Sequence, residues 1–411
     1  MLSENEKLEV LARLGIDLSM IHDLDILMQR ILTEARRFVN ADAGSIYIRD
    51  KDMLHFTYTQ NDTLQRRLSE REKLIYSTFS IPVNEKSIAG YVAASSQPLN
   101  LPDVYKIEPT KPYHFNKEID EDSKYTTQSV LTIPLKNFND DVLGILQIIN
   151  SQDEAMRVIP FTENDEKMLM HFASIAAVAL ERAQMTRAIL LRMIRMAELR
   201  DPKETGAHVN RVGGYAVEIY EKWANNRDLP QKEIDKNRDI LRMAAMLHDV
   251  GKIAISDLIL KKPGRFNRRE YEIMKQHTVL GAQLFLDRQS DFDEAAAQVA
   301  LNHHERWDGQ GYPGHVDVRT GKFLHGFERF DGGAQGKKGE EIPLYGRIVA
   351  LADVYDALST ARAYKEAWDE TEILAKIEES TGRHFDPELV AIFFSCLDIL
   401  HSIQRRYVDE D

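Results

Sequence analysis

Histidines and carboxylates recur over the last two hundred residues of the chain at spacings suited to one metal centre. They stand in five segments: Glu204-Thr-Gly-Ala-His208, His248-Asp249-Val-Gly-Lys252, His277, His303-His304 and Asp353-Val-Tyr-Asp356. Five histidines and at least three carboxylates are enough for two or three divalent metals that keep positions open for water. Such a centre generates hydroxide at neutral pH and neutralises phosphate charge. The pattern therefore indicates a metal-dependent phosphohydrolase.

Two of these segments belong to longer motifs. The chain reads His248-Asp249-Val-Gly-Lys252 and later His303-His304-Glu305-Arg306-Trp307-Asp308-Gly309-Gln310-Gly311-Tyr312-Pro313. In this order the motifs resemble the HD-GYP family, a branch of the HD phosphohydrolases, from about Arg192 to the end of the chain. Family members typically hydrolyse cyclic di-GMP, so the resemblance implies cleavage to the linear dinucleotide pGpG, or further to GMP. Two alternatives stay open: another cyclic dinucleotide such as cyclic GMP-AMP as substrate, or a cyclic di-GMP-binding effector with negligible turnover.

The resemblance also implies a set of metal ligands. The basic site is expected from His208, His248, Asp249 and Asp353, a second metal from His277, His303 and His304, and a third with the help of Glu204. The alternative for Glu204 is a solvated carboxylate near a helix start. Imidazole and carboxylate without thiolate suit Fe, Mn or Ni better than structural Zn. Since similar proteins hold iron or manganese, we expect two or three Fe or Mn ions.

The residues expected to act on the substrate are few. The resemblance implies that Asp249 bridges two metals and that Lys252 meets a phosphate oxygen or the leaving group. It also implies that Arg362 and Lys365 grip the second phosphate and a guanine, the alternative being a solvated helix end. Tyr312 is expected to stack or hydrogen bond at the pocket mouth.

Helices must position these residues. Apolar spacing predicts helices over 241–247, leading to His248, and over 271–287, 294–303 and 347–358. A last helix opens at Asp386, as N-cap, with Pro387 at its first position, and runs through Leu400. His248 and Asp249 are expected on a helix, about 100° apart. A Gly-rich insertion, residues 315–337, follows the Gly-Tyr-Pro motif and is either a lid or an outward loop.

The first half of the chain has a different pattern. Helical spacing over residues 5–38, with a break at Asp17 or Asp23, precedes strand-like runs at 45–49, 54–58, 129–134 and 142–149. This α+β pattern predicts an antiparallel sheet with flanking helices. The runs Ser87-Ile-Ala-Gly-Tyr-Val-Ala93, Leu99-Asn-Leu-Pro-Asp103, Thr132-Ile-Pro-Leu135 and Val142-Leu-Gly-Ile-Leu-Gln-Ile-Ile-Asn150 resemble a GAF sensor domain over residues 18–182.

A small ligand in this GAF segment is one expectation. Asn150, Phe161, Asp165 and Glu166 fit the signature of cyclic-nucleotide-binding GAF domains, but Ser151 replaces its Lys. We therefore favour the interpretation that these residues cap a strand and open a helix.

A long helix is predicted over residues 164–199, between segments 1–182 and 192–411. Its apolar stripe alternates spacings of three and four along Leu169, Phe172, Ala176, Ala179, Ala183, Thr186, Leu190, Met193 and Ala197. Up to about residue 180 the stripe can pack on the sheet, but beyond Arg182 it needs another partner. We therefore expect a homodimer whose paired helices carry a signal to an all-helical catalytic domain.

Composition sets the remaining limits. At 411 residues, 43% of them hydrophobic, the chain suggests two or three domains with ample core. A net charge of −13 argues against a binder of nucleic-acid polymers, which needs a basic surface. Cys396, the single cysteine, excludes internal disulfides and indicates a reducing compartment. No apolar run approaches the ~18 residues of a membrane span, so we expect a cytoplasmic protein without a membrane partner.

Overall fold

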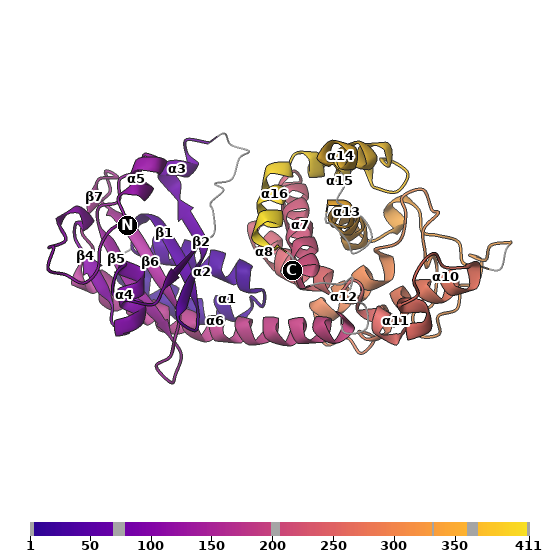
Figure 1. Cartoon of the computed structure of the whole chain (residues 1–411), viewed down its shortest axis with the longest axis horizontal. Helices are drawn as coiled ribbons and strands as arrows, with labels where there is room; N and C mark the ends of the chain where they lie inside the picture. Colours follow the sequence, from indigo (N-terminus) through magenta and orange to yellow (C-terminus); the bar gives the residue numbers. More distant parts are fainter. Residues whose placement is uncertain (1–3, 69–78, 199–205, 331–332, 360–368, 409–411) are drawn as a thin grey trace. The chain divides into compact units, whose positions relative to one another are not determined.

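The computed structural model describes residues 4–68, 79–198, 206–330, 333–359 and 369–408 (Figure 1). Contacts divide the chain into two compact units, Met1–Arg187 and Ala188–Asp411.

The first unit is built on an antiparallel sheet with strand order β3-β2-β1-β6-β5-β4, and β7 pairs with β6 (Figure 1). The strands are β1 (Ala41–Asp50), β2 (Met53–Asn61), β3 (Ser80–Pro82), β4 (Leu99–Leu101), β5 (Val130–Lys136), β6 (Val142–Gln152) and β7 (Val158–Ile159). All four predicted strand runs lie within or overlap β1, β2, β5 and β6, so the antiparallel sheet is confirmed. The short strands β3, β4 and β7 were not predicted.

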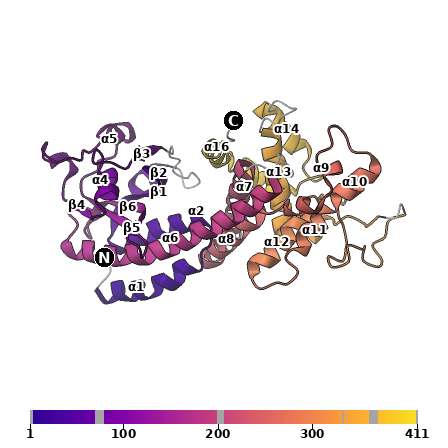
Figure 2. The same cartoon turned by 60° about the horizontal axis from the view of Figure 1, so that its bottom comes forward.

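Helices cover both faces of this sheet. On one face, alternate strand residues such as Ile46 of β1 and Ile133 of β5 form a core cluster with three helices. These helices are α1 (Glu4–Ser19), α2 (Leu24–Phe38) and the first part of α6 (Glu163–Glu198). Figures 1 and 2 both show these three helices beside the sheet. The opposite face, with Tyr47 and Ile145, packs against α4 (Ile88–Ser95). The short elements α3 (Asp62–Gln65), η1 (Val104–Lys106) and α5 (Glu118–Ser123) lie in the connections.

The predicted break in the first helical stretch falls at Asp23. Its carboxylate accepts hydrogen bonds from the backbone nitrogens of Asp25, at 3.0 Å, and Ile26, at 3.1 Å. These bonds satisfy backbone donors that the first turn of α2 leaves open, which is why the chain restarts a helix there. Of the two predicted break positions, Asp23 is confirmed.

The residues of the cyclic-nucleotide signature make bonds within the protein. Asn150 Nδ2 donates to Tyr125 Oη at 2.9 Å, and Asn150 Oδ1 accepts from Gln128 N at 2.7 Å. Asp165 accepts from Thr162 N at 3.0 Å and from Thr162 Oγ1 at 2.7 Å, at the start of α6. These contacts agree with the capping interpretation.

The named elements in the described part of the second unit are all helices, as predicted, and residues 303–330 and 333–338 form turns and isolated β-bridges. Its elements are α7 (Gly206–Asn225), α8 (Gln231–Met246), η2 (Val250–Ala254), α9 (Asp257–Leu260), α10 (Arg268–Lys275), α11 (His277–Gln283), α12 (Asp291–Asn302), η3 (Gly339–Glu341), α13 (Leu344–Ser359), α14 (Glu370–Glu379), α15 (Pro387–Phe394) and α16 (Leu397–Arg406). One core cluster joins α7, α8, α12, α13 and α15. Cys396 is buried between α15 and α16.

Three details of the helical predictions are wrong. The helix predicted over 271–287 is interrupted at Gln276, between α10 and α11. The last helix starts at Asp386 as expected, but it ends at Phe394 and α16 continues at an angle of 72°. His248 and Asp249 lie in the turn after α8 rather than on a helix, because α8 ends at Met246. Apolar spacing indicates where helices run, but it does not mark a break within a helix or the position of its last residue.

Most of the predicted stripe along α6, a single continuous helix in Figure 2, is buried where the structure describes burial, whereas Thr186 and Met193 are half-buried. Leu169, Phe172 and Ala176 belong to the core of the first unit. Leu190 belongs to the core of the second unit and is only 9% exposed, together with Ile194 at 5%. Leu190 therefore does not need a partner helix, contrary to the expectation for the stripe beyond Arg182.

Among the described residues, no single helix has the length and hydropathy of a bilayer span, whereas α15 and α16 reach that length and hydropathy together as a bent pair.

Candidate metal centre

Seven of the predicted ligands meet in two neighbouring groups within the second unit. Ligand atoms lie within 4.8 Å of one another in each of two sets: Asp249, His277, His303 and His304, and His208, His248 and Asp353. Asp249 lies between the sets. Its Oδ1 is 3.1 Å from His277 Nε2, and its Oδ2 is 3.3 Å from His248 Nε2. The two groups are therefore parts of one centre.

Four of the histidines are held by their Nδ1 atoms. Each Nδ1 lies 2.7–3.1 Å from an oxygen that can only accept: Asp356 Oδ2 for His208, Ala245 O for His248, Met274 O for His277, and Val299 O and Ala300 O for His303. Nδ1 must then carry the proton, and the Nε2 lone pair points into the centre. This outer bond is how proteins orient a metal-binding imidazole.

The inner atoms of the centre have few bonds to protein. Among the described residues, His277 Nε2, His303 Nε2 and Asp249 Oδ1 are buried without a hydrogen-bond partner. Leaving a buried polar atom unsatisfied costs about 1–3 kcal/mol. A divalent cation that accepts these lone pairs would remove this cost. The donor set therefore fits a metal ion, with histidine and carboxylate ligands converging on it.

The protonation states agree with metal binding. Burial lowers the pKa of His303. Burial, together with the neighbouring His303 and His277, also holds the pKa of His304 well below its usual value. Burial alone would raise the pKa of Asp249, but Lys252 and His248 outweigh it and hold the pKa well below its usual value. At neutral pH the centre thus offers His303 and His304 as neutral imidazoles and Asp249 as an ionised carboxylate, the forms that bind metals.

Close backbone packing brings the His248-Asp249 turn against His277. The turn runs into η2, where Gly251 lies against the start of α11. A Cβ atom on Gly251 would overlap the carbonyl oxygen of His277 and the backbone of Gly281. Only glycine allows this approach, so Gly251 is needed to bring the ligands of two separate segments together.

Asp356 is a functional candidate to which the sequence analysis gave no role. Its side chain is 1% exposed and lies 2.8 Å from His208 Nδ1. Arg211 donates to both carboxylate oxygens, from Nε at 2.6 Å and from Nη2 at 2.9 Å. Burial would raise the pKa of Asp356, but these hydrogen bonds lower it below its usual value. The spacing of three from Asp353 on α13 was an available signal that both carboxylates share a helix face.

The predicted substrate residues are placed only in part. Lys252 Nζ lies 2.6 Å from Asp249 Oδ2, so a cation lies at the centre. The Tyr312 ring stacks on His304, with centroids 4.8 Å apart. Arg362 and Lys365, like the predicted ligand Glu204, lie outside the described residues.

Glu305 is the second residue without a predicted role. It follows His304, is 2% exposed, and accepts hydrogen bonds from Gly314 N at 2.6 Å and Lys337 N at 3.1 Å. These two nitrogens lie at the two ends of the 315–337 insertion. One carboxylate therefore fastens the base of the insertion to the segment that carries two ligands. Burial raises the pKa of Glu305 to about 7.

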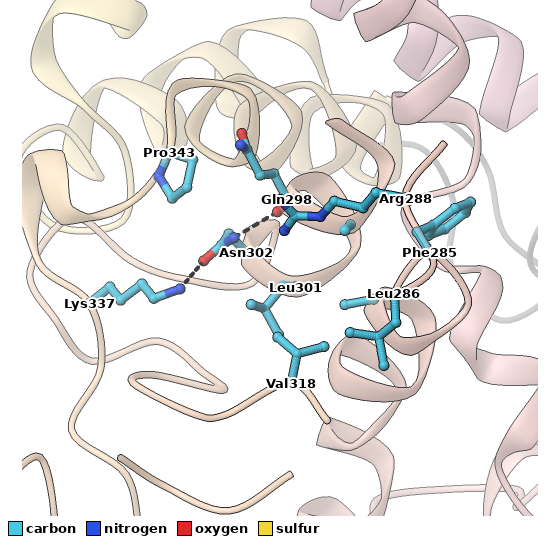
Figure 3. A pocket seen from close by; sticks show the side chains of 11 residues that line it. Phe285, Leu286, Arg288, Gln298, Leu301, Asn302, Val318, Lys337 and Pro343 are labelled. Atoms are coloured by element: carbon cyan, nitrogen blue, oxygen red, sulfur yellow. Dashed lines mark hydrogen bonds between the residues drawn. The ribbon is translucent and has the colours of Figure 1, made fainter. Parts of the chain in front are cut away.

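A pocket of about 200 Å³ lies apart from the ligands (Figure 3). Its walls come from α11, α12 and the insertion, and Figure 3 shows Leu301 and Val318 there with Lys337 pointing toward Asn302. Lys337 Nζ donates to Asn302 Oδ1 at 2.6 Å. None of the seven ligands in the described part of the chain lines this pocket. The candidate site for chemistry is the metal centre.

Comparisons with known proteins match both halves of the chain. A GAF domain model matches residues 23–180, and an HD domain model matches residues 205–358. A cyclic di-GMP phosphodiesterase of Vibrio cholerae is 33% identical over 69% of this chain and 50% of its own length. A 3'3'-cGAMP-specific phosphodiesterase 2 of the same organism is 35% identical over 50% of this chain and 34% of its own.

A third relative is the cyclic di-GMP phosphodiesterase response regulator RpfG of Xanthomonas campestris. It is 40% identical over 50% of this chain and 46% of its own length. The chain thus spans half or less of the length of these three relatives.

Proposed function

Because the chain carries a GAF domain followed by an HD domain, we propose that it is a metal-dependent phosphodiesterase that hydrolyses cyclic di-GMP. The observation that supports this most directly is the pair of ligand groups around Asp249. Such a centre can catalyse phosphate ester hydrolysis, and two of the similar proteins carry cyclic di-GMP phosphodiesterase in their names.

Two or three metal ions, Fe or Mn, are proposed for this centre. Asp249, His277, His303 and His304 would hold one, His208, His248 and Asp353 another, with Asp249 between them and Glu204 assisting a third. Metals bound there supply a water of lowered pKa and positive charge near the phosphate. Elemental analysis of anaerobically purified protein should find at least two metals per chain, and Glu204→Ala should lose about one. A stoichiometry of one in the wild-type protein would contradict the multinuclear assignment.

The chain's own residues orient and neutralise the phosphodiester. Asp249 holds Lys252 through the 2.6 Å ion pair, so the ammonium is positioned to stabilise charge on a phosphoryl or leaving oxygen. Tyr312 keeps its proton, because burial raises its pKa, and offers a ring and a hydroxyl beside His304. Arg362 and Lys365 are proposed to bind the second phosphate and a guanine. Opening one of the two phosphodiester bonds yields pGpG, and a second cleavage yields GMP.

Cyclic GMP-AMP is the second candidate substrate, since one relative is named as specific for 3'3'-cGAMP. Metal-loaded protein should be incubated with each cyclic dinucleotide and the products separated by chromatography. Faster conversion of cyclic di-GMP to pGpG supports the first proposal, and faster loss of cyclic GMP-AMP supports the second. Binding of cyclic di-GMP without product would make the protein an effector.

We propose that the chain forms a regulatory homodimer, and that the contact between the two copies is made by a different face of α6 from the predicted stripe. Val178, Met185, Ile189 and Met196 are 66%, 65%, 50% and 54% exposed. At 3.6 residues per turn these four lie within about 40° of one line and span about 27 Å. A second copy of the chain would bury this exposed row against its own equivalent, as in a parallel coiled coil. A small ligand in the GAF domain would then act on catalysis through the paired helices.

A further inference from the structure

An exposed tyrosine lies next to the metal centre. Tyr271, on α10, is 46% exposed, and its ring meets the Tyr312 ring edge-on, with centroids 6.1 Å apart and planes at 77°. Tyr312 in turn stacks on the ligand His304, at 4.8 Å and 30°. The three rings form a continuous path from a metal ligand to solvent.

A lysine accompanies the two tyrosines. Lys275 Nζ lies 5.4 Å from the ring centroid of Tyr271 and 5.8 Å from that of Tyr312, within the range of cation–π attraction. Its ammonium also pairs with Glu272 Oε1 at 2.7 Å. The cation therefore contacts both rings at the edge of the centre, where an anionic ligand would approach.

The helix that carries Tyr271 and Lys275 is held in place at its start and along one side. Asn267 and Glu270 form a reciprocal capping box at the first turn of α10. Ile273 and Met274 pack on the small apolar cluster formed with α9. Tyr271 is left outside this packing, so an anchored helix presents an aromatic side chain to solvent.

We infer that Tyr271 and Lys275 form a nucleobase subsite, in which a purine of the dinucleotide stacks on the Tyr271 ring while its phosphate lies at the metal centre. This inference rests on the proposed function. Stacking on an aromatic ring suits any base, because every base has a π-face, and a nearby cation adds attraction for the anionic nucleotide. Exposed aromatic side chains are common on protein surfaces, so Tyr271 is distinguished by its contact with Tyr312 and Lys275 rather than by exposure.

The test compares Tyr271→Ala with Phe323→Ala in metal-loaded, full-length protein. Phe323 is a matched control because it is an aromatic residue of the same unit with 44% exposure. Tyr271→Ala should raise KM for cyclic di-GMP by about tenfold or more and change kcat by less than about twofold. Phe323→Ala should leave both constants at their wild-type values. Tyr271→Phe, which keeps the ring, should recover most of the lost affinity.

Product inhibition separates stacking from a structural effect. GMP carries a base and orthophosphate does not, so Tyr271→Ala should weaken inhibition by GMP about tenfold and leave inhibition by orthophosphate unchanged. Equal losses for both inhibitors, or a fall in kcat at unchanged KM, would overturn the subsite while the proposed function stands. If the wild-type protein converts no cyclic dinucleotide, the proposed function fails and the subsite fails with it.

Discussion

Asp120 of the GAF domain and Asp249 of the HD domain are both largely buried carboxylates, but their surroundings differ. Asp120 accepts hydrogen bonds from Thr127 N at 2.6 Å, Thr127 Oγ1 at 2.8 Å and Tyr105 Oη at 2.8 Å. Asp249 pairs with Lys252 through Oδ2, and its Oδ1 faces the Nε2 atoms of His277 and His303, 3.1 and 3.5 Å away. Protein donors therefore satisfy the Asp120 carboxylate, which fixes a loop. Asp249 Oδ1 instead faces the lone pairs of two imidazole nitrogens.

The same contrast separates the histidines of the centre from ordinary buried polar residues. Protein oxygens bind their Nδ1 atoms, as they would in any folded core. On the inner side of the centre, His277 Nε2, His303 Nε2 and Asp249 Oδ1 have no hydrogen-bond partner among the described residues. A polar cluster whose outer atoms are hydrogen bonded while its buried inner atoms are not is thus evidence for a ligand. A cluster such as that of Asp120, whose carboxylate oxygens accept hydrogen bonds from protein, is evidence for local structure.

The largest expected effect is the loss of Asp249. Asp249→Ala should abolish hydrolysis and metal loading together, because it removes the carboxylate that belongs to one ligand group and lies 3.3 Å from His248 of the other. Asp120→Ala should instead lower the free energy of unfolding of the GAF domain by about 1–3 kcal/mol, since it leaves buried donors unpaired. Turnover and metal content should be measured for both variants, and thermal unfolding reports the loss of stability expected for Asp120→Ala. Full metal content in Asp249→Ala would remove the contrast between the two carboxylates.

Lys252→Ala should have the next largest effect. Loss of one charge-stabilising donor costs about 10²–10³ in rate, while the metal ligands remain in place. Elemental analysis should therefore match the wild-type protein, and kcat should fall. Wild-type turnover in this variant would show that Lys252 is not at the reacting phosphate.

Asp356→Asn tests the outer bonds of the centre. The amide cannot reproduce the carboxylate that both orients His208 and pairs with Arg211. Removal of such an outer partner typically costs about 10–100-fold in metal affinity. Competition with a chelator measures the change. An unaltered affinity would mean that the ring of His208 is held without Asp356.

The smallest effect on catalysis is expected from the exposed row on α6. Met185→Glu combined with Ile189→Glu would place like charges in a buried seam, at several kcal/mol, and should weaken dimerisation at least a hundredfold. Met170→Glu is the control, because Met170 is 43% exposed and lies about 80° from the row. Light scattering at micromolar concentration reports the assembly, and the metal content should not change. A wild-type monomer under these conditions would refute the dimer.

The sequence by itself determined the types of candidate metal ligand, their order along the chain and the helical elements around most of them. Local signals suffice for this, because a His-Asp pair, a His-His pair and apolar periodicity are visible without knowing what packs where. The N-caps Asp23 and Asp386 were visible for the same reason, since capping depends on neighbouring residues.

Only the tertiary structure decided the features that join distant segments. Periodicity shows that α6 has an apolar stripe, but not that Leu190 is covered by the second unit while Met185 on another face stays exposed. The break at Gln276 turns His277 toward Asp249, and Arg211 and His208 meet Asp356 across some 145 residues of sequence. Such contacts depend on which surfaces fit together when the chain packs, and a local pattern of residues carries no record of that choice.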